Sequence, residues 1–167
     1  KALKNGEASI KTENLKIKFD KMILDQKNLT INASGNVEIY QIDEKLLINT
    51  ESIIFDRKNR VLSSKTNSTL TDNEKNTFTM DSFEYEINNN ILKLENANFT
   101  DYENNKFHTS IAFINTKTNK LFGKNINIDL NNKSFNTNND PRLKGNSIIK
   151  DKEVTEITKG VFTTCKK

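Results

Sequence analysis

The side chains that could do chemistry in this sequence are few and far apart. His108 is the only histidine and Cys165 the only cysteine, so an activated nucleophile would have to combine groups from distant parts of the chain. The sequence has no pairs of Cys or His at the spacing of metal ligands. We therefore predict that the protein is not an enzyme and that it needs neither a metal nor a cofactor.

The acidic residues are explained by turn formation. Asp56, Glu86 and Asp101 recur at positions typical of turns, and turn formation accounts for them without a bound ion. A calcium site would need the dense Asp-x-Asp spacing that this chain lacks. Glycine is sparse, and no segment has the form of a phosphate-binding loop.

The elements that would position any site come from a repeated phrase. Each copy has a short alternating apolar run, a turn rich in Asp, Glu, Lys or Asn, a second apolar run, and a step of small residues into a third. The copies lie at residues 22–40, 52–70, 82–100, 111–129 and 147–165. A period of about 30 residues predicts a stack of similar β units.

Hairpin signals recur inside the copies. The polar turns fall at residues 25–28, 56–59, 86–90, 115–119 and 150–153, and Asn and Asp tolerate the left-handed backbone that tight turns need. The flanking runs alternate: Phe83, Tyr85 and Ile87 point one way, while Glu84 and Glu86 point the other. A period of two is typical of half-buried strands, so the fold class is predicted to be all-β.

Length and composition suit one such array. The chain has 167 residues, of which 34% are apolar, so the core should be a thin seam. We expect a single domain over residues 1–167, with a main array at about 8–130, a loop at 131–146 that contains Pro141, and a final unit at 147–167. A long surface loop inside one domain is the alternative interpretation of that loop. The strand-like ending suggests a fragment of a longer chain.

Charge and hydropathy exclude some partners. The net charge of +4 is scattered, whereas a nucleic-acid site needs clustered Lys and Arg, so we expect no nucleic-acid partner. Mild basicity suits contact with an anionic membrane surface or a phosphorylated glycolipid. No run is long and apolar enough to span a bilayer, and the first residues lack the apolar centre of a signal peptide.

The apolar faces are the remaining candidate for a site. One set of side chains is expected to project to one side of the stacked strands: Ile53, Phe55, Leu62, Phe83, Tyr85, Leu92, Leu94, Phe99, Ile111, Phe113, Leu121, Ile126 and Ile128. They could form an ordinary closed sandwich core. Alternatively, two splayed sheets could leave an apolar groove for acyl chains, in which each buried methylene contributes about 0.8 kcal/mol. Alternation does not separate these, and a register error of one residue would turn every side chain outward.

Three segments carry a resemblance to a known family. The phrase ASGNVEI (33–39) with Phe19 and Asp20 before it, and the run from DPRLKG (140–145) to KGVFTTC (159–165), resemble the OstA-type repeats of lipopolysaccharide transport proteins. The ending in particular is similar to the periplasmic N-terminal domain of the LptD family of outer-membrane lipopolysaccharide-assembly proteins, just before its barrel begins.

The resemblance implies a fold, a function and partners. The fold would be an OstA-like (LptA-like) β-jellyroll of two V-shaped antiparallel sheets that passes lipopolysaccharide acyl chains along an apolar groove. The partners would be lipopolysaccharide, a periplasmic bridge protein of the same fold that pairs by its edge strands, the barrel of the same chain and its plug lipoprotein. The domain would lie in the periplasm of a Gram-negative cell, attached to the outer membrane.

The resemblance also implies roles for single residues. A family cysteine at the position of Cys165 forms a disulfide with cysteines of the barrel, which would lie outside this sequence. Lys93 or Lys120 at the mouth of the groove would meet phosphate. The chain departs from the family by lacking the barrel and any upstream cysteine. Two alternatives stay open: a soluble periplasmic bridge protein of the same fold, and a structural or adhesin β-repeat module without lipid binding.

Overall fold

The computed structural model describes residues 2–73, 75–101, 104–131, 140–151 and 154–165. These residues form fourteen strands and two short 3-10 turns, η1 (Lys11–Glu13) and η2 (Ile87–Asn89). The strands are β1 (Ala2–Ile10), β2 (Leu15–Asp25), β3 (Thr30–Gln41), β4 (Leu46–Asp56), β5 (Val61–Ser64), β6 (Ser68–Thr71), β7 (Thr77–Met80), β8 (Ser82–Glu86), β9 (Ile91–Thr100), β10 (Lys106–Asn115), β11 (Lys120–Asp129), β12 (Arg142–Lys150), β13 (Thr155–Thr158) and β14 (Val161–Thr163). The prediction of an all-β chain is confirmed.

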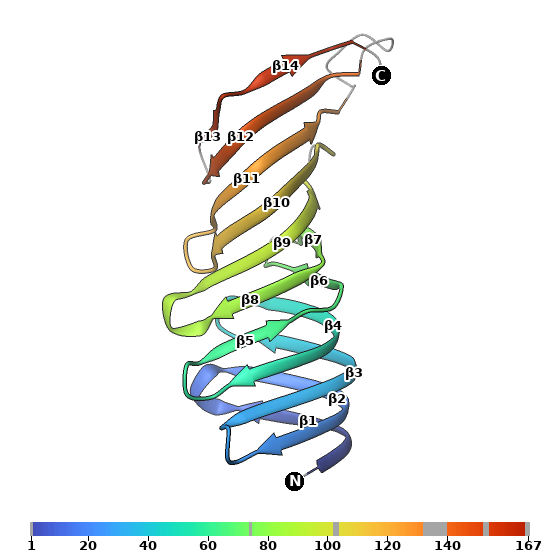
Figure 1. Cartoon of the computed structure of the whole chain (residues 1–167), viewed down its shortest axis with the longest axis vertical. Helices are drawn as coiled ribbons and strands as arrows, with labels where there is room; N and C mark the ends of the chain where they lie inside the picture. The colour runs from blue at the N-terminus through green and yellow to red at the C-terminus, as the bar shows by residue number, and fades with distance from the viewer. Residues whose placement is uncertain (1, 74, 102–103, 132–139, 152–153, 166–167) are drawn as a thin grey trace.

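The strands form one antiparallel sheet, in which successive strands are stacked along the long axis of the molecule (Figure 1). Hydrogen-bonded neighbours follow the order β1-β2-β3-β4-β5-β8-β9-β10-β11-β12-β13, with β6 and β7 between β4 and β9 and with β14 against β12. Because nearly all neighbours are consecutive in the sequence, the N-terminus and the C-terminus lie at opposite ends of the stack (Figure 1).

This sheet is folded lengthwise into two walls. The split is visible where one long strand meets two short ones: β4 pairs with β6 through its first half and with β5 through its second half, and β9 pairs with β8 and then with β7. We call wall A the segments 21–25, 30–34, 52–56, 61–64, 82–86, 91–95, 111–115, 120–124, 147–150 and 155–158. Wall B comprises 6–10, 15–18, 37–41, 46–50, 68–71, 77–80, 97–100, 106–109, 126–129, 142–145 and 161–163.

Left-handed Asn residues turn the chain at the corner between the walls. Asn5, Asn36, Asn96 and Asn125 have positive φ in the middle of β1, β3, β9 and β11, a conformation that Asn tolerates better than most residues. The Asn36 amide donates to Asp20 at 2.9 Å, and those of Asn96 and Asn125 bond corner residues in the same way. The corners at Asn36, Asn96 and Asn125 fall at the small-residue steps of the repeated phrase.

Gly35 is required at one corner. Its φ is +75°, and a Cβ there would lie 2.5 Å from the Asp20 carboxylate. The register of β3 shifts on both sides at this point, between Ser34 and Val37, so the strand can bend sharply without losing its partners.

The predicted turns coincide with hairpin connections of wall A. Asp25 accepts hydrogen bonds from the backbone of Lys27 and Asn28, and Asp56 does the same for the two corresponding residues of the next repeat. These bonds hold the pKa of both Asp carboxyls below the ordinary value. The turn expected at 150–153 lies partly outside the described residues.

The boundary expected near Pro141 needs correction. β12 begins at Arg142, inside the segment 131–146 that was expected to be a loop, because Leu143 pairs with Ile128 of β11 and with Phe162 of β14. The Pro141 carbonyl accepts a bond from the Leu130 amide, so the ladder continues past the proline. Residues 132–139 lie outside the described part of the chain.

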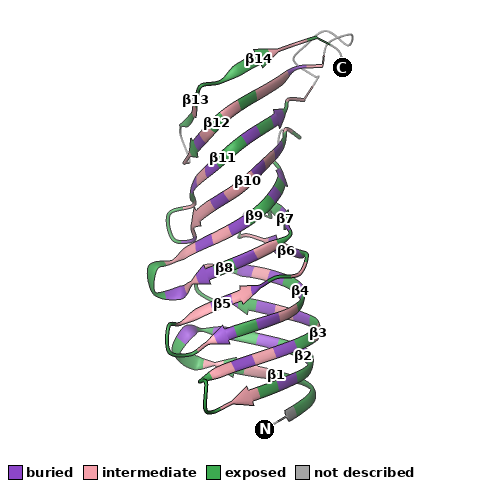
Figure 2. Cartoon of the chain, viewed as in Figure 1, coloured by how far each residue is buried: buried purple, intermediate pink, exposed green. Residues whose placement is uncertain are grey.

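The core lies between the walls. In the N-terminal half, Ile17 and Ile39 of wall B face Ile53 and Leu62 of wall A, and all four are at most 2% exposed. Buried and exposed residues alternate along the strands there, as Figure 2 shows. This half of the stack is a closed core.

Candidate functional site

The C-terminal half of the stack contains a cavity between the walls. It has a volume of about 800 Å³, and we call it the slot. Its apolar lining comes from both walls: Leu46, Leu70, Phe78, Phe99, Phe107, Ile128 and Leu143 from wall B, and Leu92, Ile114, Leu121 and Ile157 from wall A; Leu130 and Val154 follow β11 and precede β13. A volume of this size falls within the range of about 300–1,000 Å³ typical of ligand sites.

Aromatic rings cover the wall B side of the slot. The Phe99 and Phe107 rings stack with centroids 4.2 Å apart and planes inclined by 7°, and the Phe78 ring tilts against Phe99 at 5.1 Å. Because all three side chains are at most 8% exposed, the stack has little side-chain freedom to lose when an apolar ligand arrives.

The rim of the slot is polar because it is built from turns. Asp72 bonds to Asn76, and Asp101 bonds to Asn105, in two equivalent turns of wall B. Thr116, Asn119 and Asp151 lie between strands on the wall A side, and Thr155 is the first residue of β13. The slot is therefore amphipathic, with an apolar floor and a hydrogen-bonding edge along the open seam where the turns of the two walls face each other.

One cation lies inside the slot. Lys150 faces inward at the end of β12, opposite Leu121, and its ammonium lies 5.3 Å from the centroid of the Phe107 ring on the other wall. A cation over a ring face is attracted by the ring quadrupole. Lys150 therefore reaches across the slot from wall A to wall B.

The slot ends where the core closes. The Tyr85 hydroxyl lies 3.3 Å from the Thr116 hydroxyl, and burial raises the pKa of Tyr85. One carboxylate oxygen of Glu44 is buried without a hydrogen-bond partner among the described residues, and this desolvation raises the pKa of Glu44. The charges of Glu44 and Asp43 add to the raised pKa of Tyr85, so these groups lie at one end of the slot.

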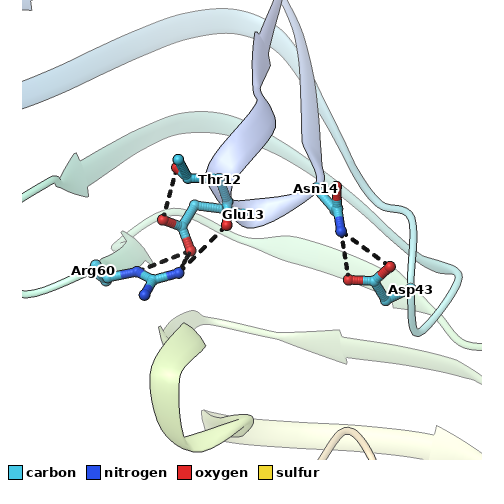
Figure 3. Close-up of polar contacts among 5 residues, drawn as sticks. All are labelled: Thr12, Glu13, Asn14, Asp43 and Arg60. Carbon is cyan, nitrogen blue, oxygen red and sulfur yellow. Dashed lines mark hydrogen bonds and ion pairs between the residues drawn. The ribbon is translucent and has the colours of Figure 1, made fainter.

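Nearer the N-terminal end of the stack, a group of polar contacts joins turns of the two walls; we call it the clasp, and Figure 3 shows its members Thr12, Glu13, Asn14, Asp43 and Arg60. Arg60, in the β4–β5 turn of wall A, donates to the buried carboxylate of Glu13 in η1, on the wall B side, through both Nε and Nη2. The Thr12 hydroxyl also donates to Glu13, and Asn14 donates to Asp43 in the next turn of wall B. The clasp holds the two walls together at the closed end.

Loss of the Arg60 side chain should lower the free energy of unfolding. An Arg60→Gln variant leaves the Glu13 carboxylate buried without its cation, and an unsatisfied buried acceptor costs about 1–3 kcal/mol. A second change, Glu13→Gln, should restore most of the loss, and urea unfolding of the wild type, both single variants and the double variant gives the coupling. Lys18→Gln, which breaks an exposed pair with Glu38, is the control and should change little. Equal effects of Arg60→Gln and Lys18→Gln would contradict the clasp.

The thirteen side chains predicted to face inward separate into three groups. Four line the slot: Leu92, Phe99, Leu121 and Ile128. Seven are buried in the core but do not line the slot: Ile53, Phe55, Leu62, Phe83, Tyr85, Leu94 and Ile126. The prediction was wrong for Ile111 and Phe113, which lie on the outer face of wall A.

The error at Ile111 and Phe113 comes from the corner of β10. Phe107 and Thr109 face inward before the corner, and Ala112 and Ile114 face inward after it, so the alternation changes phase between them. Phe113 pairs instead with Lys93 and Phe122, whose ring lies 6.3 Å away on the outer face.

The cations expected at the mouth are also placed differently. Lys93 lies on the outer face and pairs with Glu95 at 2.9 Å, and Lys120 is exposed at the start of β11 outside the slot lining. Lys150 occupies the position that sequence reasoning missed. Its signal was weak because Lys150 falls at the edge of a predicted turn.

The residues with chemical potential are not brought together. His108 lies on the outer face of wall B, where its Nδ1 is 2.9 Å from the side-chain oxygen of Asn98. Cys165 is exposed with a free thiol, and its carbonyl accepts a bond from Arg142. Within the described ranges, no group of three or more His, Cys, Asp or Glu residues is placed to hold a metal ion. In the same part of the chain, no helix has the length and hydropathy of a membrane span.

Comparisons with known proteins match the geometry. A family model described as OstA-like protein matches residues 1–140. The crystal structure of LptH, the LptA-homologous periplasmic component of the lipopolysaccharide transport device of Pseudomonas aeruginosa, superimposes with a TM-score of 0.56 over 70% of this chain and 86% of that chain, at 17% sequence identity. No curated protein matches the sequence. The structural match confirms the predicted β-jellyroll fold.

Proposed function

Because the chain belongs to the OstA-like protein family, we propose that it takes part in lipopolysaccharide transport in the periplasm, by holding acyl chains in the slot. The observation that carries this proposal is an apolar cavity that stays open between the walls of the C-terminal half. In the N-terminal half of the same sheet, inward side chains such as Ile17 and Ile53 are at most 2% exposed and pack into the core.

The lining explains how a chain could be held and still move. The apolar side chains of the slot offer many similar contacts, each methylene contributing about 0.8 kcal/mol, so sliding by one methylene exchanges one contact for another. No bond is made or broken in this step, which is why the function we propose is not enzymatic. The energy for movement must come from another protein.

A more specific proposal is that the chain is the periplasmic N-terminal domain of an outer-membrane assembly protein of the LptD family. The resemblance of residues 140–165 supports it, and the exposed thiol of Cys165 is accessible to cysteines elsewhere in such a protein. The disulfide, the barrel, the plug lipoprotein and the attachment to the outer membrane belong to this proposal. A soluble periplasmic bridge protein is the alternative, and the coding sequence after Lys167 distinguishes the two.

The ends of the stack suit pairing with a bridge protein of the same fold. Among the described residues, β1 pairs only with β2, and β13 and β14 pair only with β12. Unpaired strand edges are templates for adding a strand from another chain. We propose that one of these edges receives the bridge protein.

Photo-crosslinking tests the proposed function. A crosslinking residue at Leu121 or Ile128, in the slot, should capture lipopolysaccharide on irradiation, whereas Glu84 and Ile54, which point outward and line neither hollow, should capture little. Capture that is equal at all four positions, or absent from the slot, would favour a structural β-repeat module without lipid binding.

A further inference from the structure

A second hollow lies on the outer face of wall B, beside the rim of the slot. It has a volume of about 580 Å³, and we call it the outer groove. Its polar lining includes Lys75, Thr79, Asn98, Thr100, Lys106, His108, Asn127 and Asp129. Phe99 and Phe107 line both the outer groove and the slot, so a single layer of sheet separates the two. Figure 1 shows β7, β9 and β10, which carry Phe99, Phe107 and most of the polar lining, at the same level of the stack.

The outer groove presents hydrogen-bonding side chains in a regular row. Thr79, Asn98, His108 and Asn127 are direct cross-strand neighbours on β7, β9, β10 and β11. Since the His108 ring bonds to Asn98, both side chains are held in place. Hydroxyl, amide and imidazole groups at the spacing of adjacent strands, about 4.8 Å, can bond to a ligand that carries several hydroxyls.

The charges of the two hollows differ. The charged residues among those that line the slot are Asp72, Asp101, Asp151 and Lys150, which leaves an excess of acid at its rim. The outer groove has Lys75 and Lys106 against Asp129. An anionic group therefore gains more in the outer groove than at the slot rim. Lysine is also a usual partner of phosphate.

We propose that the outer groove binds the phosphorylated sugar part of the amphiphile whose acyl chains occupy the slot. This inference rests on the proposed function, because the slot supplies the apolar half of the site. The path between the two halves crosses the lip of wall B at the end of β9 and the start of β10, where Thr100 and Lys106 are neighbours. A headgroup there would stay on the solvent side while the chains lie between the walls.

The test compares two glycolipids that differ by one group. Calorimetry would measure binding of a short-chain diacylated glucosamine phosphate and of its dephosphorylated counterpart to the wild type and to a Lys75→Gln/Lys106→Gln variant. We expect the variant to bind the phosphorylated lipid about tenfold more weakly and the dephosphorylated lipid within about twofold of the wild type. A Lys27→Gln/Lys58→Gln variant, which removes the same charge from exposed turns of wall A, should leave both affinities within about twofold.

A free sugar phosphate separates the groove from the slot. Glucosamine 1-phosphate at millimolar concentration should shift the side-chain amide signals of Asn98 and Asn127 in NMR spectra. Such shifts without binding of either glycolipid would support the groove and overturn the slot function. Glycolipid binding that is the same with and without the phosphate, or equally weakened by both double variants, would overturn the groove and leave the slot function standing.

Discussion

An Ile114→Asp variant is expected to bind a medium-length acyl chain at least about tenfold more weakly than the wild type. Ile114 lines the slot and is only partly buried, so the substitution places a carboxylate next to the chain without removing a core residue. When an acyl chain packs against the carboxylate, either the carboxylate loses its hydration or part of the chain stays exposed to water. Either cost in binding free energy exceeds the 1.4 kcal/mol that corresponds to a factor of ten. Displacement of a fluorescent fatty acid measures the effect.

The neighbouring residue provides the control. Phe113→Asp introduces the same charge one position earlier, on the outer face of wall A, and should leave acyl-chain affinity within about twofold of the wild type because surface charges act weakly across the sheet. Circular dichroism would verify that both variants fold. If Phe113→Asp abolished binding and Ile114→Asp did not, the phase of β10 assigned to the slot would be wrong.

The second large effect is on stability. Ile53→Ala should lower the free energy of unfolding by about 2–5 kcal/mol, because Ile53 is 2% exposed in the closed core and its loss leaves a cavity. Ile54 is the next residue on β4 but is 51% exposed, and Ile54→Ala should cost no more than about 0.5 kcal/mol.

Urea denaturation of both isoleucine variants measures this difference. Acyl-chain binding should change little in Ile53→Ala at low urea, since Ile53 lies outside the slot. Similar costs for the two substitutions would contradict the closed core of the N-terminal half.

Much of the fold follows from local sequence. The turn at 25–28 and its repeat at 56–59 are specified by an Asp that accepts from the backbone two and three residues later, which is a short-range interaction. The small-residue steps predicted where one run passes to the next, such as Gly35 and Asn36, are the corners of the folded sheet.

Side-chain direction was harder to predict beyond a corner. The alternation inward and outward changes phase at the bends of β2, β4, β9, β10 and β11, whereas on β3 it keeps the same phase from Ala33 to Val37. Nothing in a period of two reveals how many residues a bend consumes. On β9 the small Ala97 marks the restart, and Phe99, two residues later, is buried. On β10 the inward residue is the small Ala112. The bulky Ile111 and Phe113 on either side of it looked more like core residues, so the sequence pattern favoured the wrong phase.

The extent of the slot depends on contacts between distant residues. Closure of one end involves Glu13 and Arg60, which come from different repeats and carry no local signal of pairing. The aromatic floor includes Phe78 on a strand of four residues and Phe107 next to His108, where short runs give little periodicity to read. Both possibilities raised by the sequence, a closed core and an apolar groove, occur in different halves of one sheet.

A spin-labelled acyl chain would test the central claim most directly. A fatty acid with a nitroxide near its methyl end should broaden the backbone amide signals of slot residues such as Leu92, Leu121 and Leu143. The signals of Ile17 in the closed core and of Ile54 on the outer face should remain sharp. Broadening confined to outer-face residues, or spread evenly over the protein, would contradict a lipid-binding slot between the walls.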